Sequence, residues 1–250
     1  MAGRIRLDLA LEQRGLARSR ARARDAVLRG TVKVNGVPAA KPSQMIGAAD
    51  RVELDDPAHG YVSRAALKLI AGLDAGEIDV AGKICLDLGA STGGFSQVLA
   101  ERGAKKVYAV DVGHEQLHDD IRALPVVVSM EGVNVKELTR ESIPEPIDLL
   151  VCDISFVSVT KVIAAALSLC CPGADAVILI KPQFEVGRDN IGKGGIVTDP
   201  AAIEAAVGDV IGFMADRGFA LRQSLPSPIS GGDGNKEVVA LFRKTGYIAT

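Results

Sequence analysis

A glycine-rich turn preceded by an acidic residue is the first feature of this sequence that could carry chemistry. The stretch ICLDLGASTGGFSQVL, residues 84–99, passes from an apolar run into a cluster of three glycines and then resumes as a helix. Glycines at a strand-to-helix junction allow the backbone to approach a bound cofactor closely. The turn is therefore predicted to hold a cofactor, and its spacing bears on which one.

The residues around these glycines exclude two common phosphate-binding loops. A Walker loop needs a lysine and a serine or threonine after its last glycine, whereas Gly94 is followed by Phe95. The dinucleotide pattern G-x-G-x-x-G is also absent. Asp87, just ahead of the first glycine, would repel a pyrophosphate and attract a cation. These features favour S-adenosylmethionine, which carries an ammonium and a sulfonium, over a nicotinamide cofactor or a tight turn without a ligand.

A second acidic residue follows the next predicted strand. Asp111, in the stretch YAVDVG, stands 22 residues after Gly89. An acid at this position of a doubly wound sheet can bind both hydroxyls of a ribose. We expect the cofactor to contact these segments and one further polar residue, namely Asp87, Gly89, Ser91, Thr92, Gly93, Gly94, Phe95, Asp111, Val112 and Asn134.

Four more charged residues fall at the ends of predicted elements or beside them. Asp153 ends one strand and Lys181 ends the next. Glu237 begins the last strand, and Lys68 lies on the helix before the first strand. The carboxyl ends of parallel strands line the ligand crevice. A ribose 2′-hydroxyl needs its proton removed or its developing alkoxide stabilised, and a lysine can do either. Each residue alone could be an unrelated surface charge, but together they favour a hydroxyl as the methyl acceptor.

The signatures of base methylation are missing. Amino-group methyltransferases commonly carry N/D-P-P-Y at the end of the fourth strand, where this chain has CDISF. Enzymes that methylate carbon five of cytosine use a cysteine that usually follows a proline, whereas Cys171 precedes Pro172. A sugar oxygen is thus preferred over a base as the acceptor.

The stretch HEQLH, residues 114–118, matches the zinc-protease pattern H-E-x-x-H. Its three fixed letters often match by chance, and no extended G-x-x-H follows. The segment also begins soon after Asp111, where a helix must start to cover the sheet. We therefore expect a surface helix here and no metal site.

The chain from residue 83 onward alternates between apolar runs of strand length and helical patterns. This alternation indicates an α/β fold with a parallel, doubly wound, Rossmann-like sheet. A terminal hairpin is expected to make one edge strand antiparallel, and Ser63 is expected to cap a helix that ends near Gly72. Strands are predicted at 83–89, 106–111, 126–130, 147–153, 175–181, 219–225 and 236–243, and helices at 95–102, 114–123, 158–170 and 199–218.

The beginning of the chain has a different character. Two helical patterns, 4–15 and 19–29, precede the stretch TVKVNGVPA, in which Asn35-Gly36 is a strong hairpin signal. A strand at 51–55 completes a small α+β domain. The predicted organisation is a first domain over residues 1–55, a linker over 56–62 and a methyltransferase domain over 63–250.

Charge is distributed unevenly between these parts. Residues 1–60 carry 11 Lys or Arg against 7 Asp or Glu, whereas residues 61–250 carry 18 against 24. A basic front on an acidic body indicates a module for binding polyanions joined to an enzyme core.

One apolar stretch, residues 162–180, is long enough to suggest a membrane span. Pro172-Gly173 and Asp175 interrupt it, so a helix, a turn and a buried strand are expected instead. The four cysteines include no CxxC pair, and the first residues lack the apolar core of a signal peptide. These features favour a cytoplasmic protein with buried thiols.

The sequence also resembles a known family. RLDLALEQRGLARSRARARDAVLRGTVKVNGVPAAKPSQMI is similar to an S-four-type RNA-binding domain. The stretches YVSRAALKL, DLGASTGGF, VDVGHEQL, CDISF, IKPQFEVGR, GKGGIV and GNKEVV resemble the TlyA family of rRNA 2′-O-methyltransferases, whose catalytic domain is FtsJ-like. The resemblance covers essentially the whole chain, in order.

This resemblance implies a Lys-Asp-Lys-Glu catalytic tetrad at Lys68, Asp153, Lys181 and Glu237, with Lys181 as the central base or alkoxide stabiliser. It implies S-adenosylmethionine as methyl donor and a cytidine in ribosomal RNA as acceptor, in the large subunit and sometimes also in the small one. Some members carry the name haemolysin. The RNA-binding candidates that it implies are Arg4, Arg6, Ser19, Arg20 and Lys41.

Phe156 and Phe184 lie beside the predicted tetrad, where they could either hold a flipped cytidine or belong to the core. Two other functions stay open at this point. One is a membrane-active haemolysin, and the other is an RNA-binding ribosome assembly factor with a catalytically silent methyltransferase fold.

Overall fold

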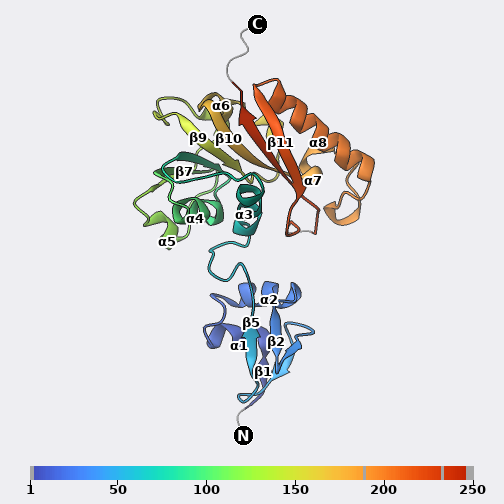
Figure 1. Ribbon diagram of the computed structural model, residues 1–250. Coiled ribbons are helices and arrows are strands. Elements are labelled where there is room, and N and C mark those ends of the chain that lie inside the picture. The colour runs from blue at the N-terminus through green and yellow to red at the C-terminus, as the bar shows by residue number, and fades with distance from the viewer. Residues whose placement is uncertain (1–2, 188–189, 232–233, 246–250) are drawn as a thin grey trace. The chain divides into compact units, whose positions relative to one another are not determined.

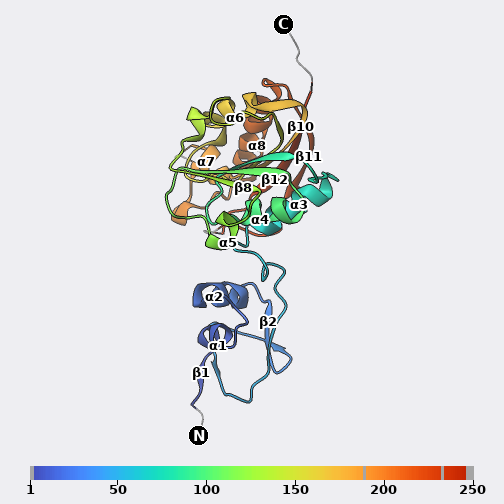
Figure 2. The ribbon, with the colours of Figure 1, turned by 90° about the vertical axis from the view of Figure 1, so that its left-hand side faces the viewer.

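The computed structural model describes residues 3–187, 190–231 and 234–245. The chain divides into two compact units, Met1–Gly60 and Tyr61–Thr250. In both Figure 1 and Figure 2 the first unit is coloured blue, and the second unit runs from cyan to red.

The first unit is a small α+β domain. Its core is built by buried residues of both helices, such as Leu7, Leu11 and Val27, packed on Val32 and Ile46. The strands β1 and β4 form one antiparallel pair, and β3, β2 and β5 form a second antiparallel sheet. The elements are β1 (Ile5–Arg6), α1 (Leu7–Gln13), α2 (Arg20–Leu28), β2 (Val32–Val34), β3 (Val37–Pro38), β4 (Met45–Ile46) and β5 (Val52–Leu54).

Local signals in this unit act largely as predicted. Ser19 caps α2, because its Oγ accepts a hydrogen bond from the Arg22 amide at 3.3 Å. Asn35 and Gly36 both adopt positive φ, as a tight hairpin turn between β2 and β3 requires. The first helix begins later than predicted, at Leu7, because residues 5–6 pair with β4 instead.

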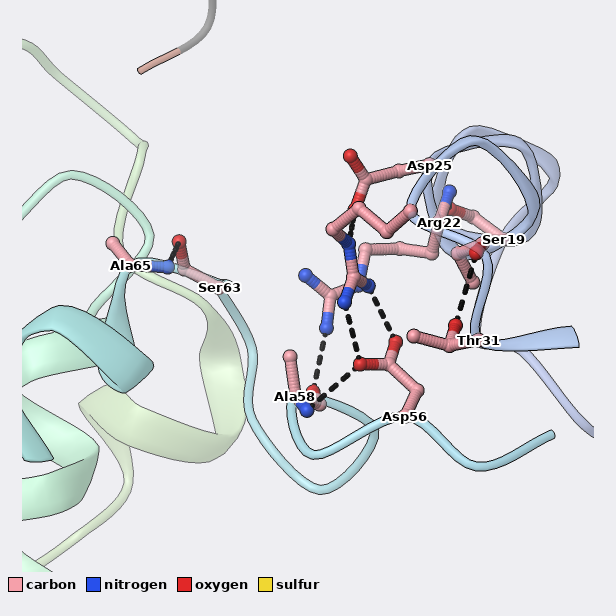
Figure 3. Close-up of polar contacts among 10 residues, drawn as sticks. Ser19, Arg22, Asp25, Thr31, Asp56, Ala58, Ser63 and Ala65 are labelled. Carbon is pink, nitrogen blue, oxygen red and sulfur yellow. Dashed lines mark hydrogen bonds and ion pairs between the residues drawn. The ribbon is translucent and has the colours of Figure 1, made fainter. Parts of the chain in front are cut away.

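The segment after β5 is fastened to α2 by two arginines (Figure 3). The Arg29 guanidinium donates to both carboxylate oxygens of Asp56, at 2.8 and 2.6 Å, and to Asp25 at 2.9 Å. Arg22 donates to the Ala58 carbonyl at 2.8 Å, and burial lowers the pKa of this arginine. Residues 56–58, which lie in the predicted linker, are thus held by side chains of the first unit.

The second unit is built around a seven-stranded sheet of order β11-β12-β10-β9-β6-β7-β8. The five strands from β10 to β8 are parallel, and β12 runs antiparallel to both of its neighbours. The strands are β6 (Ile84–Leu88), β7 (Lys106–Asp111), β8 (Val127–Glu131), β9 (Ile147–Cys152), β10 (Cys170–Ile180), β11 (Phe219–Pro226) and β12 (Val238–Lys244).

Helices cover both faces of this sheet (Figure 1, Figure 2). Alternate strand residues point to opposite faces: Cys85 packs with α3 and α4, whereas Leu86 and Leu88 pack with α6 and α8. The doubly wound architecture is therefore confirmed. The helices are α3 (Ala66–Ala75), α4 (Gly94–Glu101), α5 (Asp119–Arg122), α6 (Ala164–Ser168), α7 (Pro182–Glu185) and α8 (Pro200–Ala215).

The antiparallel strand was predicted at an edge of the sheet. In the structure it lies one place in from the edge. The terminal hairpin forms, yet its second strand, β12, inserts between β10 and β11. The middle of β12, from Val239 to Phe242, is apolar and buried, which suits this strand to a covered position.

Two predicted helices are wrong in extent. Of the helix expected over 114–123, only α5 forms, and His118 is its N-cap. The helix expected over 158–170 is replaced by a 3₁₀ turn at Val159–Lys161 and the short α6. The strand expected from residue 175 begins at Cys170, with a register shift before Asp175.

The apolar stretch 162–180 contains a short helix, α6, and a buried strand, β10, as predicted. The change from helix to strand comes earlier than predicted, however, because Pro172, Gly173 and Asp175 lie within β10. Among the described residues, no helix combines the length and apolar character needed to cross a bilayer.

Gly72 provides a test of how closely α3 packs on the sheet. A Cβ atom at this position would lie 2.9 Å from Val239 and 3.0 Å from Val177. We expect Gly72→Val to lower the free energy of unfolding by about 1–3 kcal/mol through overpacking. Gly208→Val in α8, where a Cβ would meet nothing within 4 Å, is the matched control and should not destabilise the chain. Equal unfolding midpoints in chemical denaturation would contradict this packing.

Candidate active site

Four charged side chains meet at the edge of the sheet where the parallel strands end. Lys181 Nζ lies 2.7 Å from Asp153 Oδ1, and Lys68 Nζ lies 3.8 Å from Asp153 Oδ2. Lys68 Nζ is also 2.5 Å from Glu237 Oε2. The order Lys181, Asp153, Lys68, Glu237 alternates in charge, so each ammonium faces a carboxylate.

The antiparallel direction of β12 explains why Glu237 belongs to this cluster. In the sheet register Ile180 of β10 pairs with Val238 of β12. Lys181 therefore leaves β10 at the same edge where Glu237 enters β12. Asp153 follows β9, and its amide donates to the Leu88 carbonyl at the end of β6 at 3.0 Å. Lys68 is supplied by α3.

These four side chains are nearly excluded from solvent. Asp153 Oδ1 and Glu237 Oε2 have no partner in hydrogen-bond geometry among the described residues, although a lysine ammonium is close to each. Lys181 Nζ does donate well-formed bonds to Ser155 Oγ at 2.7 Å and to the Asp153 carbonyl at 3.1 Å. The Lys181 ammonium is thus fixed in position, while the carboxylates are held mainly by charge.

The glycine turn lies against the same strand ends. A Cβ atom at Gly89 would lie 3.1 Å from the backbone of Asp153 and Ile154, and its φ is +79°. A Cβ at Gly93 would come within 2.8 Å of Leu117. A Cβ at Gly94 would lie 2.7 Å from Ser63. The turn is therefore as tight as its three glycines predicted, and contacts with its own chain explain all three.

Two neighbouring cavities open at this edge. One, of about 400 Å³, is lined by all four residues of the charged cluster and by Ser91, Thr92, Gly94 and Phe95 of the turn. The other, of about 500 Å³, is lined by Asp111, Val112 and Asn134. Gly89, Ser91 and Asp153 belong to both walls. A donor in the second cavity and an acceptor in the first would meet beside Asp153.

Asp111 is positioned by the backbone on both sides. Its Oδ2 accepts from the Ser91 amide and its Oδ1 from the Gly113 amide, each at 2.8 Å. Ser91 adopts a positive φ of 48° to make this contact. Because each carboxylate oxygen has two acceptor sites, Asp111 retains the capacity to accept bonds from a ribose diol.

Asp87 and Gly93, two of the predicted cofactor residues, line neither cavity. Asp87 is fully buried on the α4 face of β6, where its Oδ2 accepts from Ser96 Oγ at 2.7 Å. Its Oδ1 has no hydrogen-bond partner among the described residues. Burial, assisted by the nearby Asp153 and Asp111 carboxylates and opposed by the Ser96 hydrogen bond, raises the pKa of Asp87 to about 7.

The two phenylalanines form a pair at the mouth of the tetrad cavity. Their ring centroids are 5.6 Å apart and both rings line the wall. Phe156 is 92% exposed and has a φ of +70°, which is costly for a bulky residue. A core role for Phe156 is therefore excluded.

Several site residues were missed by the sequence analysis. Ser155 holds Lys181, and Arg64 and Gln183 line the tetrad cavity. Asn235 is buried and bridges the Gly195 carbonyl and the Val197 amide, which ties that loop beside Glu237. The available signal was that each of them lies inside one of the stretches that resemble the family, namely YVSRAALKL, CDISF, IKPQFEVGR and GNKEVV.

The RNA-binding candidates lie in the first unit. Arg6 and Arg20 both contact Asp8, and Arg4 donates to the Met45 carbonyl at 3.2 Å. Lys41 is exposed. Ser19 uses its hydroxyl as the cap of α2, which gives it a structural function in the unbound domain.

The possible zinc motif has no supporting geometry. His114 and His118 are exposed and do not share a helix, since α5 begins only at Asp119. Within the described part of the chain, no group of three or more His, Cys, Asp or Glu side chains is arranged to hold a metal ion.

Comparison with known proteins agrees with this architecture. Residues 61–244 match the family described as FtsJ-like methyltransferase, and residues 5–52 match the S4 domain. The chain therefore belongs to the FtsJ-like methyltransferase family and carries an S4 domain at its N-terminus.

Individual relatives of the chain have more specific names than the family has. The chain is 42% identical to the 16S/23S rRNA (cytidine-2′-O)-methyltransferase TlyA of Mycobacterium tuberculosis, over 97% of this chain and 91% of that protein. It is 41% identical to Hemolysin A of Brachyspira hyodysenteriae, over 95% and 99%. A solved structure of a hemolysin-named protein from Streptococcus thermophilus superposes with a TM-score of 0.76 at 36% identity, covering 98% of this chain and 90% of that one. The resemblance found in the sequence is confirmed.

The burial of Asp87 predicts a pH-dependent stability. The folded chain keeps this carboxyl protonated up to a pH of about 7, whereas its ordinary pKa is 3.8. Between pH 4 and 7 the folded state thus binds more protons than the unfolded state does. The stability that the protonated Asp87 contributes is therefore lost as the pH rises through this range. We expect the unfolding free energy of the parent minus that of Asp87→Asn to fall between pH 4 and 7.

Ser96→Ala serves as the control for this measurement. Loss of the Ser96 hydrogen bond, which lowers the pKa of Asp87, should extend the fall to higher pH. A parent-minus-variant difference that stays level across the whole range would contradict a buried, titrating Asp87.

Proposed function

We propose that this chain transfers a methyl group from S-adenosylmethionine to the 2′-hydroxyl of a cytidine in ribosomal RNA. The observation that carries the proposal is the buried Lys181–Asp153–Lys68–Glu237 cluster, which opens on a cavity beside the glycine turn. The M. tuberculosis relative, named as an rRNA (cytidine-2′-O)-methyltransferase, supports the acceptor.

The second cavity suits the adenosyl part of the donor. Asp111 offers its carboxylate to a ribose diol, Val112 presents an exposed apolar side chain to a base, and Asn134 adds a polar group. Ser91, which lines both cavities, would bring the turn against the rest of the donor, and Thr92 lines the acceptor cavity beside it. When bound, S-adenosylmethionine supplies an electrophilic methyl group on its sulfonium.

Asp87 lies behind the glycine turn and is bonded to the helix that follows it. Its carboxylate joins β6 to the first turn of α4 through Ser96, and its second oxygen remains unpartnered among the described residues. A cation bound above the turn would stabilise the ionised form of this carboxylate across a short distance in a low-dielectric region. Asp87 is thus proposed to favour a cationic donor through the field it creates, and not through contact with the cavity.

Lys181 is the proposed catalytic residue. Ser155 Oγ and the Asp153 carboxylate, which lie 2.7 Å from Lys181 Nζ, hold this amine at the cavity wall. Such a group is suited to donate a hydrogen bond to the sugar oxygen as negative charge develops on it. Asp153 is proposed to orient Lys181, while Lys68 and Glu237 neutralise and fix Asp153.

The acceptor would be delivered by the first unit. Arginines and lysines of an S4 domain contact phosphates and position the protein on RNA without selecting bases. The proposed contacts are made by Arg4, Arg6, Arg20 and Lys41, with Ser19 at the start of α2. A ribosomal substrate also implies that the protein acts where ribosomes are, which we propose to be the cytoplasm.

Two alternatives are less well supported. The name Hemolysin A of the B. hyodysenteriae relative suggests a membrane-active haemolysin. That function would not require a buried Lys-Asp-Lys-Glu cluster beside a glycine turn. A silent assembly factor would not need the tetrad in an alternating, cavity-facing arrangement.

Substitution of the central lysine tests the mechanism. Lys181→Ala should lower the rate of methyl transfer by a factor of about 10²–10³, the usual cost of losing one donor to a developing oxyanion, with donor affinity unchanged. Lys161→Ala, which removes an exposed lysine of the 3₁₀ turn, should retain the parent rate. Single-turnover transfer of a labelled methyl group would measure both. Parent-like transfer by Lys181→Ala would remove Lys181 from the mechanism.

Mapping of ribose methylation tests the substrate. Cells that lack the protein should lose a 2′-O-methylcytidine from ribosomal RNA, detected by mass spectrometry, and the parent chain should restore it where Lys181→Ala does not. An unaltered methylation pattern in the deleted strain would refute the proposed acceptor.

Phe156 tests how the acceptor is held. If its ring stacks on the target base, Phe156→Leu should weaken RNA binding about tenfold, since stacking of one base on an aromatic ring contributes about 1–3 kcal/mol. Phe156→Trp keeps a ring and should bind as the parent does. Binding that is equally tight for all three chains would exclude stacking at this position.

A further inference from the structure

The first unit contains a buried carboxylate between two exposed arginines. Asp8, on α1, is only 2% exposed. Its Oδ1 accepts from Arg6 Nε at 3.0 Å, and its Oδ2 accepts from Arg6 Nη2 at 2.8 Å. The same Oδ2 also accepts from Arg20 Nε at 3.2 Å. One carboxylate therefore brings two guanidinium groups from different elements side by side.

The backbones that carry these side chains are anchored independently. Arg6 pairs with Met45 in the β1–β4 ladder. The Arg20 amide, at the start of α2, donates to Glu12 Oε1 at 3.0 Å, and the Leu9 amide donates to Asp8 Oδ1 at 2.9 Å. The three residues thus form a cluster whose base is fixed by secondary structure.

The outer part of the cluster remains open. The side chains of Arg6 and Arg20 are 43% and 54% exposed. A guanidinium has five N–H donors, and Asp8 takes two from Arg6 and one from Arg20. The remaining donors are available to a ligand that approaches from solvent.

The charges explain why the carboxylate is needed. Two guanidinium groups repel each other, and each long side chain loses rotamer entropy when it is held in one place. A single ionised carboxylate between them offsets both effects and leaves the cluster with a net positive charge. The hydrogen bond from Arg6, together with Arg20, lowers the pKa of Asp8 to about 2, so Asp8 is ionised at neutral pH.

We infer that Asp8 is a positioning residue that holds Arg6 and Arg20 as a two-arginine clamp for one backbone phosphate of ribosomal RNA. The inference rests on the proposed function, which makes RNA the ligand of this unit. A phosphodiester presents two charged oxygens, and paired guanidinium groups match this geometry better than separate point charges do.

The clamp and the net charge of the domain predict opposite effects of Asp8→Asn on RNA affinity. Removal of a negative charge from an RNA-binding domain should strengthen binding by simple electrostatics. Because Asp8→Asn would release Arg6 and Arg20 from their shared anchor, we expect it to weaken binding about tenfold, equivalent to one charge-assisted hydrogen bond. The slope of log K against log salt should also become shallower by about 1.

The measurement uses the full chain and large ribosomal subunits from cells that lack the protein, titrated at several salt concentrations. Glu53→Gln is the matched control, because Glu53 pairs with the exposed Arg51 at 3.1 Å in the same unit. It removes the same charge and should leave binding unchanged or slightly tighter. Asp8→Asn binding as tight as the parent, or tighter, would overturn the clamp.

Two further variants separate the clamp from a general effect on folding. In an Arg6→Gln/Arg20→Gln background, Asp8→Asn should cause no additional loss, whereas another tenfold loss would show that Asp8 acts through the fold. If Asp8→Asn does not fold, Arg6→Lys keeps the charge without the forked donors, and it should show the same loss. Parent-like binding by Arg6→Lys would then overturn the clamp.

The outcomes also distinguish the two proposals. A parent chain that does not bind the subunits would overturn the proposed function and the clamp together. A parent chain that binds them, with Asp8→Asn binding equally well, would overturn the clamp alone.

Discussion

Alternation of two ammonium groups with two carboxylates at one edge of the sheet is the interaction on which the second unit depends. Charges that are nearly excluded from solvent are costly unless each one is paired. The pairing here joins side chains from α3, the end of β9, the end of β10 and the start of β12. It is satisfied only when these elements stand in register. The same register places Lys181 beside the glycine turn, so the proposed reaction centre is assembled only when the whole sheet is in register.

Much of this arrangement follows from sequence patterns. The alternation of strands and helices predicted the doubly wound sheet, and strand-end positions predicted that Asp153 and Lys181 would meet. Insertion of β12 between β10 and β11 could not be predicted, because hairpin signals describe neighbours in sequence and do not fix the order of a sheet. The placement of Asp87 was also missed. Its position in the strand gives its face, but only tertiary packing shows that α4 covers that face.

The arginines of α2 illustrate a second limit. Their number predicted a basic surface, and composition treats them alike. In the structure Arg29 is engaged by Asp25 and Asp56, and Arg22 by the Ala58 carbonyl, so these two side chains stabilise the domain itself. Arg20 points to a different partner, Asp8. Which arginine is engaged within the fold and which stays open to a ligand depends on partners such as Asp56, Ala58 and Asp8, and composition does not show these partners.

The close approach of Gly89 to Asp153 has a consequence for how such an enzyme can change. Since a side-chain carbon at residue 89 would stand only 3.1 Å from the facing backbone, the loop that would receive the donor packs directly against the strand end that carries Asp153. A side chain at residue 89 would therefore displace the proposed donor loop and Asp153 together. New donor analogues would have to be accommodated at the far wall, around Val112 and Asn134, where the structure leaves room to diverge.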